Sequence, residues 1–145
     1  MKQESLAEAV GAALVQSHTD AIIVANLRGT IRLWNPGAER LFGYPAADAL
    51  GHSLDLIIPE RLRARHWEGF DHWVRTGGGR HKPGDILAVP ALHRDGRTLK
   101  VQFTLTPLAD NAGTTTALIA ILHERTQPST PSRGTDYPAA PAASR

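Results

Sequence analysis

The feature that most constrains the fold is a set of five strand-like apolar runs that fall into two groups along the chain. The runs occupy residues 20–26, 30–34, 81–92, 98–108 and 114–123. Short turns containing Gly29, Gly96 and Gly113 separate neighbouring runs within each group. Strands joined by such short turns run antiparallel. The order therefore predicts an α+β fold, in which one five-stranded antiparallel sheet has short helices packed over one face.

Helical signals occupy the start of the chain and the stretch between the two strand groups. Leu6, Val10, Ala13 and Leu14 recur at helical spacing and predict an amphipathic helix that ends near His18. In the middle stretch, helical patterns cover residues 36–42, 45–50, 53–58 and 60–76. The first of these has Asn and Pro at its start and Gly43 after its end. Helices placed across a curved sheet enclose a pocket, and such pockets bind small ligands.

The length of 145 residues suits about one domain. Residues 1–18 are expected to form the N-terminal amphipathic helix, and residues 19–126 the folded domain. Residues 127–145 contain four prolines among Ser, Thr, Gly and Ala, with Tyr137 as the only large apolar side chain. Such a segment buries too little to offset its ordering entropy, so we expect a disordered tail.

Composition narrows the class of protein. The chain has no cysteine, which removes disulfides, zinc-thiolate sites and thiol nucleophiles. The chain has sixteen Lys and Arg residues and fourteen Asp and Glu residues, and this excess of positive charge is too small to predict nucleic-acid binding. Neither a membrane-spanning run nor an export signal is visible, so we expect a cytoplasmic protein that does not bind membranes. We also expect no enzyme, because the sequence shows no nucleophile and base pattern, acidic pair or metal cluster.

Several segments, taken in order, resemble the PAS sensory domain over about residues 16–126. They are the first hairpin, Trp34-Asn35-Pro36-Gly37-Ala38-Glu39-Arg40-Leu41-Phe42-Gly43-Tyr44, residues 51–59, Arg94-Asp95-Gly96-Arg97 and the closing strand 117–125. The resemblance implies a sensor or interaction module. The flavin-adduct and cysteine-linked chromophore types of PAS domain both need a cysteine that this chain lacks. Haem remains available, because its usual PAS ligand is a histidine.

One histidine lies in the apolar stripe of the long predicted helix. Successive residues of a helix are rotated by about 100° around its axis. Measured from His66, the side chains of Leu62, Trp73 and Phe70 lie at about −40°, −20° and 40°, on the same face of the helix. The imidazole therefore points at the core or at whatever fills it. Residues 59–80 also resemble, without gaps, the haem-PAS domain of oxygen-sensing nitrogen-fixation kinases, in which the matching histidine is the proximal iron ligand. The resemblance implies haem b bound through His66 and enclosed by Leu62, Phe70 and Trp73.

The chain departs from those kinases on the distal side. In the same ungapped match, the arginine that those kinases have on the gas-binding (distal) side of the haem corresponds to Ile86. We therefore expect an apolar distal side that favours carbon monoxide or nitric oxide over oxygen. Its expected members are Ile86, Leu87, Leu105 and Ile119.

Alternatives remain open at three points. A histidine in this position is also common in PAS domains without haem, where it forms a hydrogen bond within the core. The chain is then an apo PAS domain that serves only in dimerisation or protein interaction. The front helix either covers the outer face of the sheet or pairs with a second copy, and we favour a homodimer through helix and sheet. Without an output segment after Thr126, a gas or redox signal would either pass to an unknown protein partner, for instance in regulation of transcription, or act through a change of oligomeric state.

Overall fold

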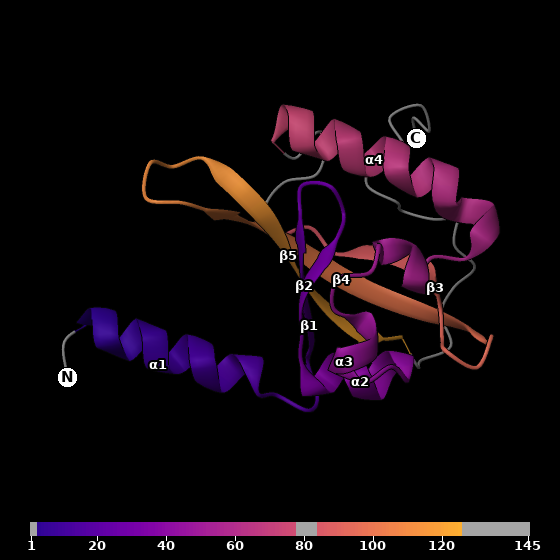
Figure 1. Cartoon of the computed structure of the whole chain (residues 1–145), viewed down its shortest axis with the longest axis horizontal. Helices are drawn as coiled ribbons and strands as arrows, with labels where there is room; N and C mark the ends of the chain where they lie inside the picture. Colours follow the sequence, from indigo (N-terminus) through magenta and orange to yellow (C-terminus); the bar gives the residue numbers. More distant parts are fainter. Residues whose placement is uncertain (1–2, 78–83, 126–145) are drawn as a thin grey trace.

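Five antiparallel strands form one sheet in the order β2-β1-β5-β4-β3 (Figure 1). The computed structural model describes residues 3–77 and 84–125. The strands are β1 (Ala21–Asn26), β2 (Ile31–Trp34), β3 (Leu87–Leu92), β4 (Thr98–Ala109) and β5 (Thr115–Glu124). The last strand pairs with β1 along the whole length of β1, which places the two strand groups side by side. The predicted α+β fold with a five-stranded antiparallel sheet is confirmed.

Six helical segments accompany the sheet in the described part of the chain. They are α1 (Gln3–Val15), α2 (Pro36–Phe42), α3 (Ala46–Ala49), the 3-10 turns η1 (Leu54–Ile57) and η2 (Glu60–Leu62), and α4 (Arg63–Thr76). Within residues 3–77 and 84–125, no helix is both long enough and apolar enough to cross a membrane.

Most element boundaries lie within one or two residues of the sequence expectation, but two differ by more. The first helix ends at Val15 rather than near His18, because the Ser17 hydroxyl accepts the amide N–H groups of Thr19 and Asp20 and turns the backbone away. Strand β3 begins at Leu87 rather than at residue 81; Gly84 before it has a φ of 93°. Residues 81–83 of that predicted strand and the predicted tail at 127–145 lie outside the described residues.

Asn35 joins the start of the sheet to α2. This side chain is 2% exposed. Its Oδ1 accepts the amide N–H groups of Ile22 and Ala38 at 2.8 and 2.9 Å. Its Nδ2 donates to the carbonyl groups of Ser17 and Asp20 at 3.1 and 2.8 Å. One amide therefore caps the helix and fixes the connector that leads from α1 into β1.

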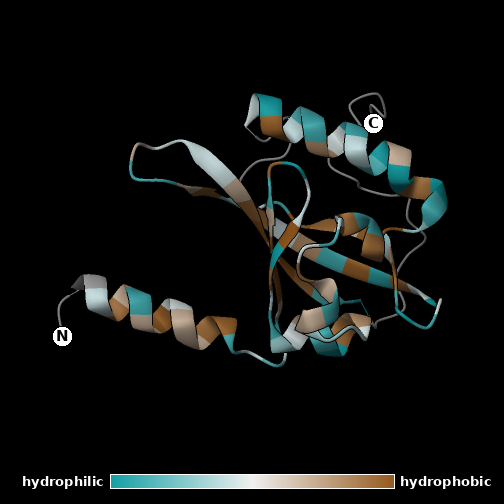
Figure 2. Cartoon of the chain, in the orientation of Figure 1, coloured by the Kyte–Doolittle hydropathy of each residue, from teal (hydrophilic) through white to brown (hydrophobic). Residues whose placement is uncertain are grey.

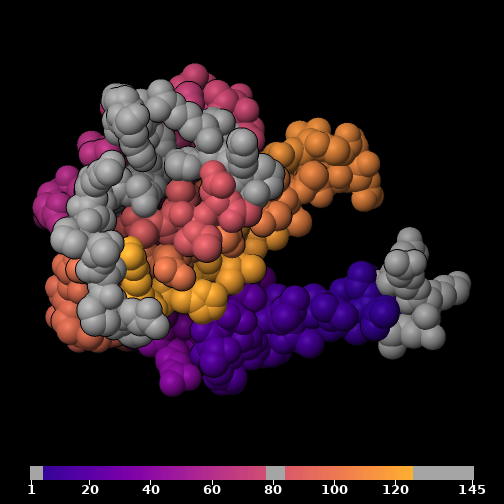
Figure 3. Space-filling model, turned by 180° about the vertical axis from the view of Figure 1, so that it is seen from behind, coloured from indigo at the N-terminus to yellow at the C-terminus, as the bar shows by residue number. Residues whose placement is uncertain are grey.

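The helix α1 stands away from the sheet (Figures 1 and 3). Its apolar residues Leu6, Val10 and Leu14 are 51%, 48% and 55% exposed. The core lies elsewhere, between the concave face of the sheet and the segments α2 to α4, and its most completely buried large side chains are Phe42, Ile31 and Val101. In the described residues, α1 therefore does not cover the sheet of its own chain.

Candidate functional site

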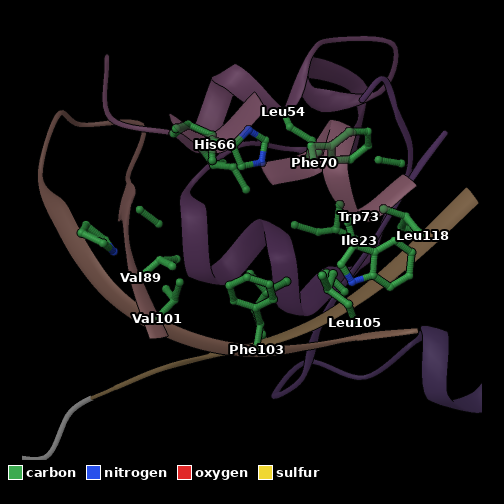
Figure 4. Close-up of a pocket in the computed structure, with 17 residues that line it drawn as sticks. Ile23, Leu54, His66, Phe70, Trp73, Val89, Val101, Phe103, Leu105 and Leu118 are labelled. Atoms are coloured by element: carbon green, nitrogen blue, oxygen red, sulfur yellow. The ribbon is translucent and has the colours of Figure 1, made fainter. Parts of the chain in front are cut away.

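A cavity separates α4 and η1 from the concave face of the sheet (Figure 4). Its volume is about 90 Å³. The helical wall consists of Leu54, Ile57, Ile58, His66, Phe70 and Trp73.

The sheet supplies the opposite wall through side chains at alternate positions of its strands. They are Ile23 and Ala25 of β1, Val101, Phe103 and Leu105 of β4, and Leu118, Ala120 and Leu122 of β5. Residues 89–91 of the edge strand β3 complete the lining. Successive strand residues point to opposite faces, which explains why every second residue of β4 and β5 lines the cavity. Among the described residues, the lining is apolar except for one imidazole.

His66 projects from α4 toward the cavity (Figure 4). Its ring lies 4.6 Å from the Trp67 ring in an edge-to-face arrangement and 6.0 Å from the Phe70 ring. Burial among these apolar groups lowers the pKa of His66 to about 4, and the nearby carboxylate of Asp55 partly opposes that change. The imidazole is therefore neutral near pH 7, the form that can offer a nitrogen lone pair to a metal ion.

Four of the seven predicted site residues meet at this cavity: His66, Phe70, Trp73 and Leu105. The structure places the other three outside its lining, which corrects the expectation for them. Leu62 is buried in the main core cluster. It lies in the 3-10 turn η2, so the angular phase of α4 does not extend to it. Ile86 precedes β3 and is 64% exposed.

Ile119 lies on the opposite face of β5 from Leu118 and Ala120, both of which line the cavity. Residues 117–122 are apolar on both faces, so the alternation in the sequence did not show which face points inward. Leu87, the other expected distal residue, is buried but is not part of the lining.

Sequence reasoning missed the contribution of η1 and most of the sheet wall. The pattern Val101, Phe103, Leu105 is a signal that could have found the β4 residues, because Leu105 was already expected to face the cavity. Leu54 and Ile57 carried no comparable signal, because a 3-10 turn has too few residues for a clear periodicity.

The five-stranded sheet and the cavity beneath α4 point to one family of proteins, and comparison with known proteins identifies the same family. The family model described as the PAS fold matches residues 15–130, so this chain belongs to the PAS family, a fold for sensing and interaction. It is 34% identical over 86 residues to sensor protein FixL of Bradyrhizobium diazoefficiens. It is 30% identical over 97 residues to oxygen sensor protein DosP of Escherichia coli.

These matches cover 59% and 67% of this chain but only 17% and 12% of the two relatives. The chain therefore spans less than a fifth of the length of either relative. A solved PAS domain from Colwellia psychrerythraea superposes with a TM-score of 0.69 at 21% identity, over 83% of this chain and 98% of that one. That likeness shows the fold alone.

Proposed function

We propose that the chain is a ligand-sensing PAS module whose cavity binds haem b through His66. The observation that carries the proposal is a neutral imidazole on α4 that faces an otherwise apolar cavity. The sensor protein FixL and the oxygen sensor protein DosP are relatives over 86 and 97 residues, which supports a sensory role.

The residues present fit haem in their chemistry. A porphyrin supplies four nitrogen ligands to its iron, so the protein needs to add one axial donor, and His66 is that donor. Phe70, Trp73 and Leu105 would lie against the apolar macrocycle. When bound, haem would supply an iron atom that can bind a diatomic gas.

The sheet side of the cavity favours gases that need no hydrogen bond. Its walls are made of Leu105, Leu118 and other apolar side chains. We therefore propose that carbon monoxide or nitric oxide is accommodated better than oxygen. The module would act in the cytoplasm without catalysis and pass its signal to a protein partner, with regulation of transcription as one outcome.

Expression with supplemented haem followed by an absorption spectrum tests the proposal. We expect a Soret band that His66→Ala abolishes or shifts, because the axial ligand is lost. His72→Ala is the matched control: it removes another histidine of α4, one that is absent from the cavity lining, and should leave the band unchanged. A colourless wild-type protein under these conditions would contradict the proposal.

A second function, dimerisation, is favoured by the exposed apolar stripe of α1. Leu6, Val10 and Leu14 have no cover from the described part of their own chain. The outer face of the sheet also exposes Ile121 and Leu108. We propose that a second copy covers both surfaces, so that the homodimer forms through helix and sheet. This function would hold whether or not the cavity contains a ligand.

A further inference from the structure

The helix that carries His66 is held to its neighbours by a cluster of four residues, which we name the α4 joint: Asp55 of η1, Arg63 and Trp67 of α4, and Gly29 of the β1–β2 turn. Arg63 and Trp67 lie one helical turn apart and flank His66 in the sequence. The joint therefore acts on the segment of α4 that presents the imidazole.

Asp55 connects η1 to both helix residues. The Trp67 indole Nε1–H donates to Asp55 Oδ1 at 2.7 Å. The Arg63 guanidinium lies 4.0 Å from the same oxygen and donates to the Asp55 carbonyl at 3.2 Å. It also donates to the Ile58 carbonyl at 3.0 Å. Charged donors and acceptors of this kind form the stronger hydrogen bonds of proteins.

The Trp67 indole fills the space between Gly29 and His66. A Cβ atom added to Gly29 would lie 2.2 Å from the indole Cη2, so only glycine leaves room for this ring. The indole also contacts the His66 ring, in the edge-to-face contact described above, and the Phe70 ring, whose centroid lies 5.2 Å away. Trp67 is thus held in place by a hydrogen bond at its nitrogen and by backbone contact at its six-membered ring, and it supports the imidazole.

The same segment of η1 is tied to the sheet. The amide N–H of Leu54 donates to the Gly29 carbonyl at 2.9 Å, and Thr30 forms a bridge with Ser53. The Ser53 hydroxyl accepts the Asp55 amide N–H at 3.0 Å. The β1–β2 turn, η1 and α4 therefore form one connected unit beside the cavity.

We propose that Asp55 is a positioning residue for His66: through Trp67 and Arg63 it fixes the orientation in which α4 presents the imidazole to the ligand. This inference rests on the proposed function and deepens it. It also provides a route by which a ligand that displaces α4 would move the β1–β2 turn through the contact of Trp67 with Gly29.

Nuclear magnetic resonance of the ligand-free chain at pH 7.5, followed by haemin titration, tests the proposal. Asp55→Ala removes the acceptor, whereas Asp55→Asn retains Oδ1 for the indole. We expect Asp55→Ala to change the ring-current shifts of the His66 protons and to weaken haemin binding by roughly tenfold, as second-shell changes do at metal sites. Asp55→Asn should restore both properties to within about twofold of wild type. Asp71→Asn, an exposed carboxylate of α4, is the matched control.

Wild-type His66 resonances in folded Asp55→Ala would overturn the positioning role, and so would wild-type haemin affinity in that variant. If Asp55→Ala does not fold, the haemin affinity of Trp67→Phe decides in its place, since this variant keeps an aromatic ring at residue 67 but lacks the donor. Failure of every protein, wild type included, to bind haemin would overturn the haem proposal instead. The resonances of the ligand-free chain would still decide whether Asp55 orients His66.

Discussion

At the scale of single residues, the environment of His66 determines its charge. The pKa of this imidazole is about 4 in the folded chain, chiefly because burial penalises the charged form, against 6.5 for an ordinary histidine. The unfolded chain therefore binds a proton that the folded chain excludes between these two pH values. The contribution of the neutral His66 imidazole to the stability of the fold is thus fully present above about pH 6.5 and decreases as the pH falls toward 4.

This difference in the pKa of His66 predicts that the folded chain loses stability in acid because of this residue. Between pH 7.5 and pH 4.5 the residue should account for a loss of roughly 2 to 3 kcal/mol in the free energy of unfolding. Urea denaturation at both pH values measures it. His66→Leu should lose less than wild type by about that amount, whereas His52→Gln, at an exposed histidine, should lose as much as wild type. Equal losses in wild type and His66→Leu would contradict the assigned pKa.

Asn35 gives a second prediction at this scale. Asn35→Ala leaves buried amide and carbonyl groups without their partner, and this should lower the free energy of unfolding by roughly 2 to 4 kcal/mol. The matched control is Asn111→Ala in the exposed β4–β5 turn, expected within about 0.5 kcal/mol of wild type. Chemical denaturation compares the two variants. A loss below about 1 kcal/mol for Asn35→Ala would show that water replaces these hydrogen bonds.

At the scale of elements, the sequence was most informative where a local signal fixes a boundary. The cap at Asn35 and the left-handed Gly43 bound α2 at the predicted residues Pro36–Phe42. The turn glycines likewise separate the predicted strands. The sequence was least informative about which face of an apolar strand points inward, as Ile119 shows, and about the change from 3-10 to α-helix after Leu62. These features depend on packing between distant segments.

The cavity wall on β5 allows a test that does not touch the imidazole. Ala120 lines the cavity, so Ala120→Trp should fill part of it and block haemin binding by at least about tenfold, since packed interiors have little room to adjust. Thr116→Trp, on an exposed part of the same strand, should leave binding unchanged. Haemin titration followed by absorption measures both. Unchanged binding in a folded Ala120→Trp variant would show that the ligand lies elsewhere.

At the scale of the whole molecule, α1 and the β4–β5 hairpin project from the body on the same side (Figures 1 and 3). Apolar residues are interspersed with polar ones along α1 (Figure 2). An isolated helix of this length is marginal in water, so its stability depends on a partner surface. The exposure of its apolar stripe could not be read from the sequence, which shows a helical pattern but not what the helix packs against.

Changing that stripe should therefore affect assembly before it affects the fold. Leu6→Glu with Val10→Glu should weaken the proposed homodimer by at least about tenfold, because two apolar contacts become charged. Glu8→Lys, which changes the charge of a polar position on α1, should have a much smaller effect. Sedimentation equilibrium gives the dissociation constants. A wild-type chain that is monomeric at high concentration would contradict the dimer.

Haem binding through His66 is tested most directly by an absorption titration of haemin into the purified ligand-free chain. We expect a Soret change that saturates at one haemin per chain in wild type and in His72→Ala. We also expect at least a tenfold weaker response in His66→Ala, because the single axial donor is then missing from the apolar cavity. Saturable binding of equal strength in His66→Ala, or no saturable binding in wild type, would contradict haem binding through His66.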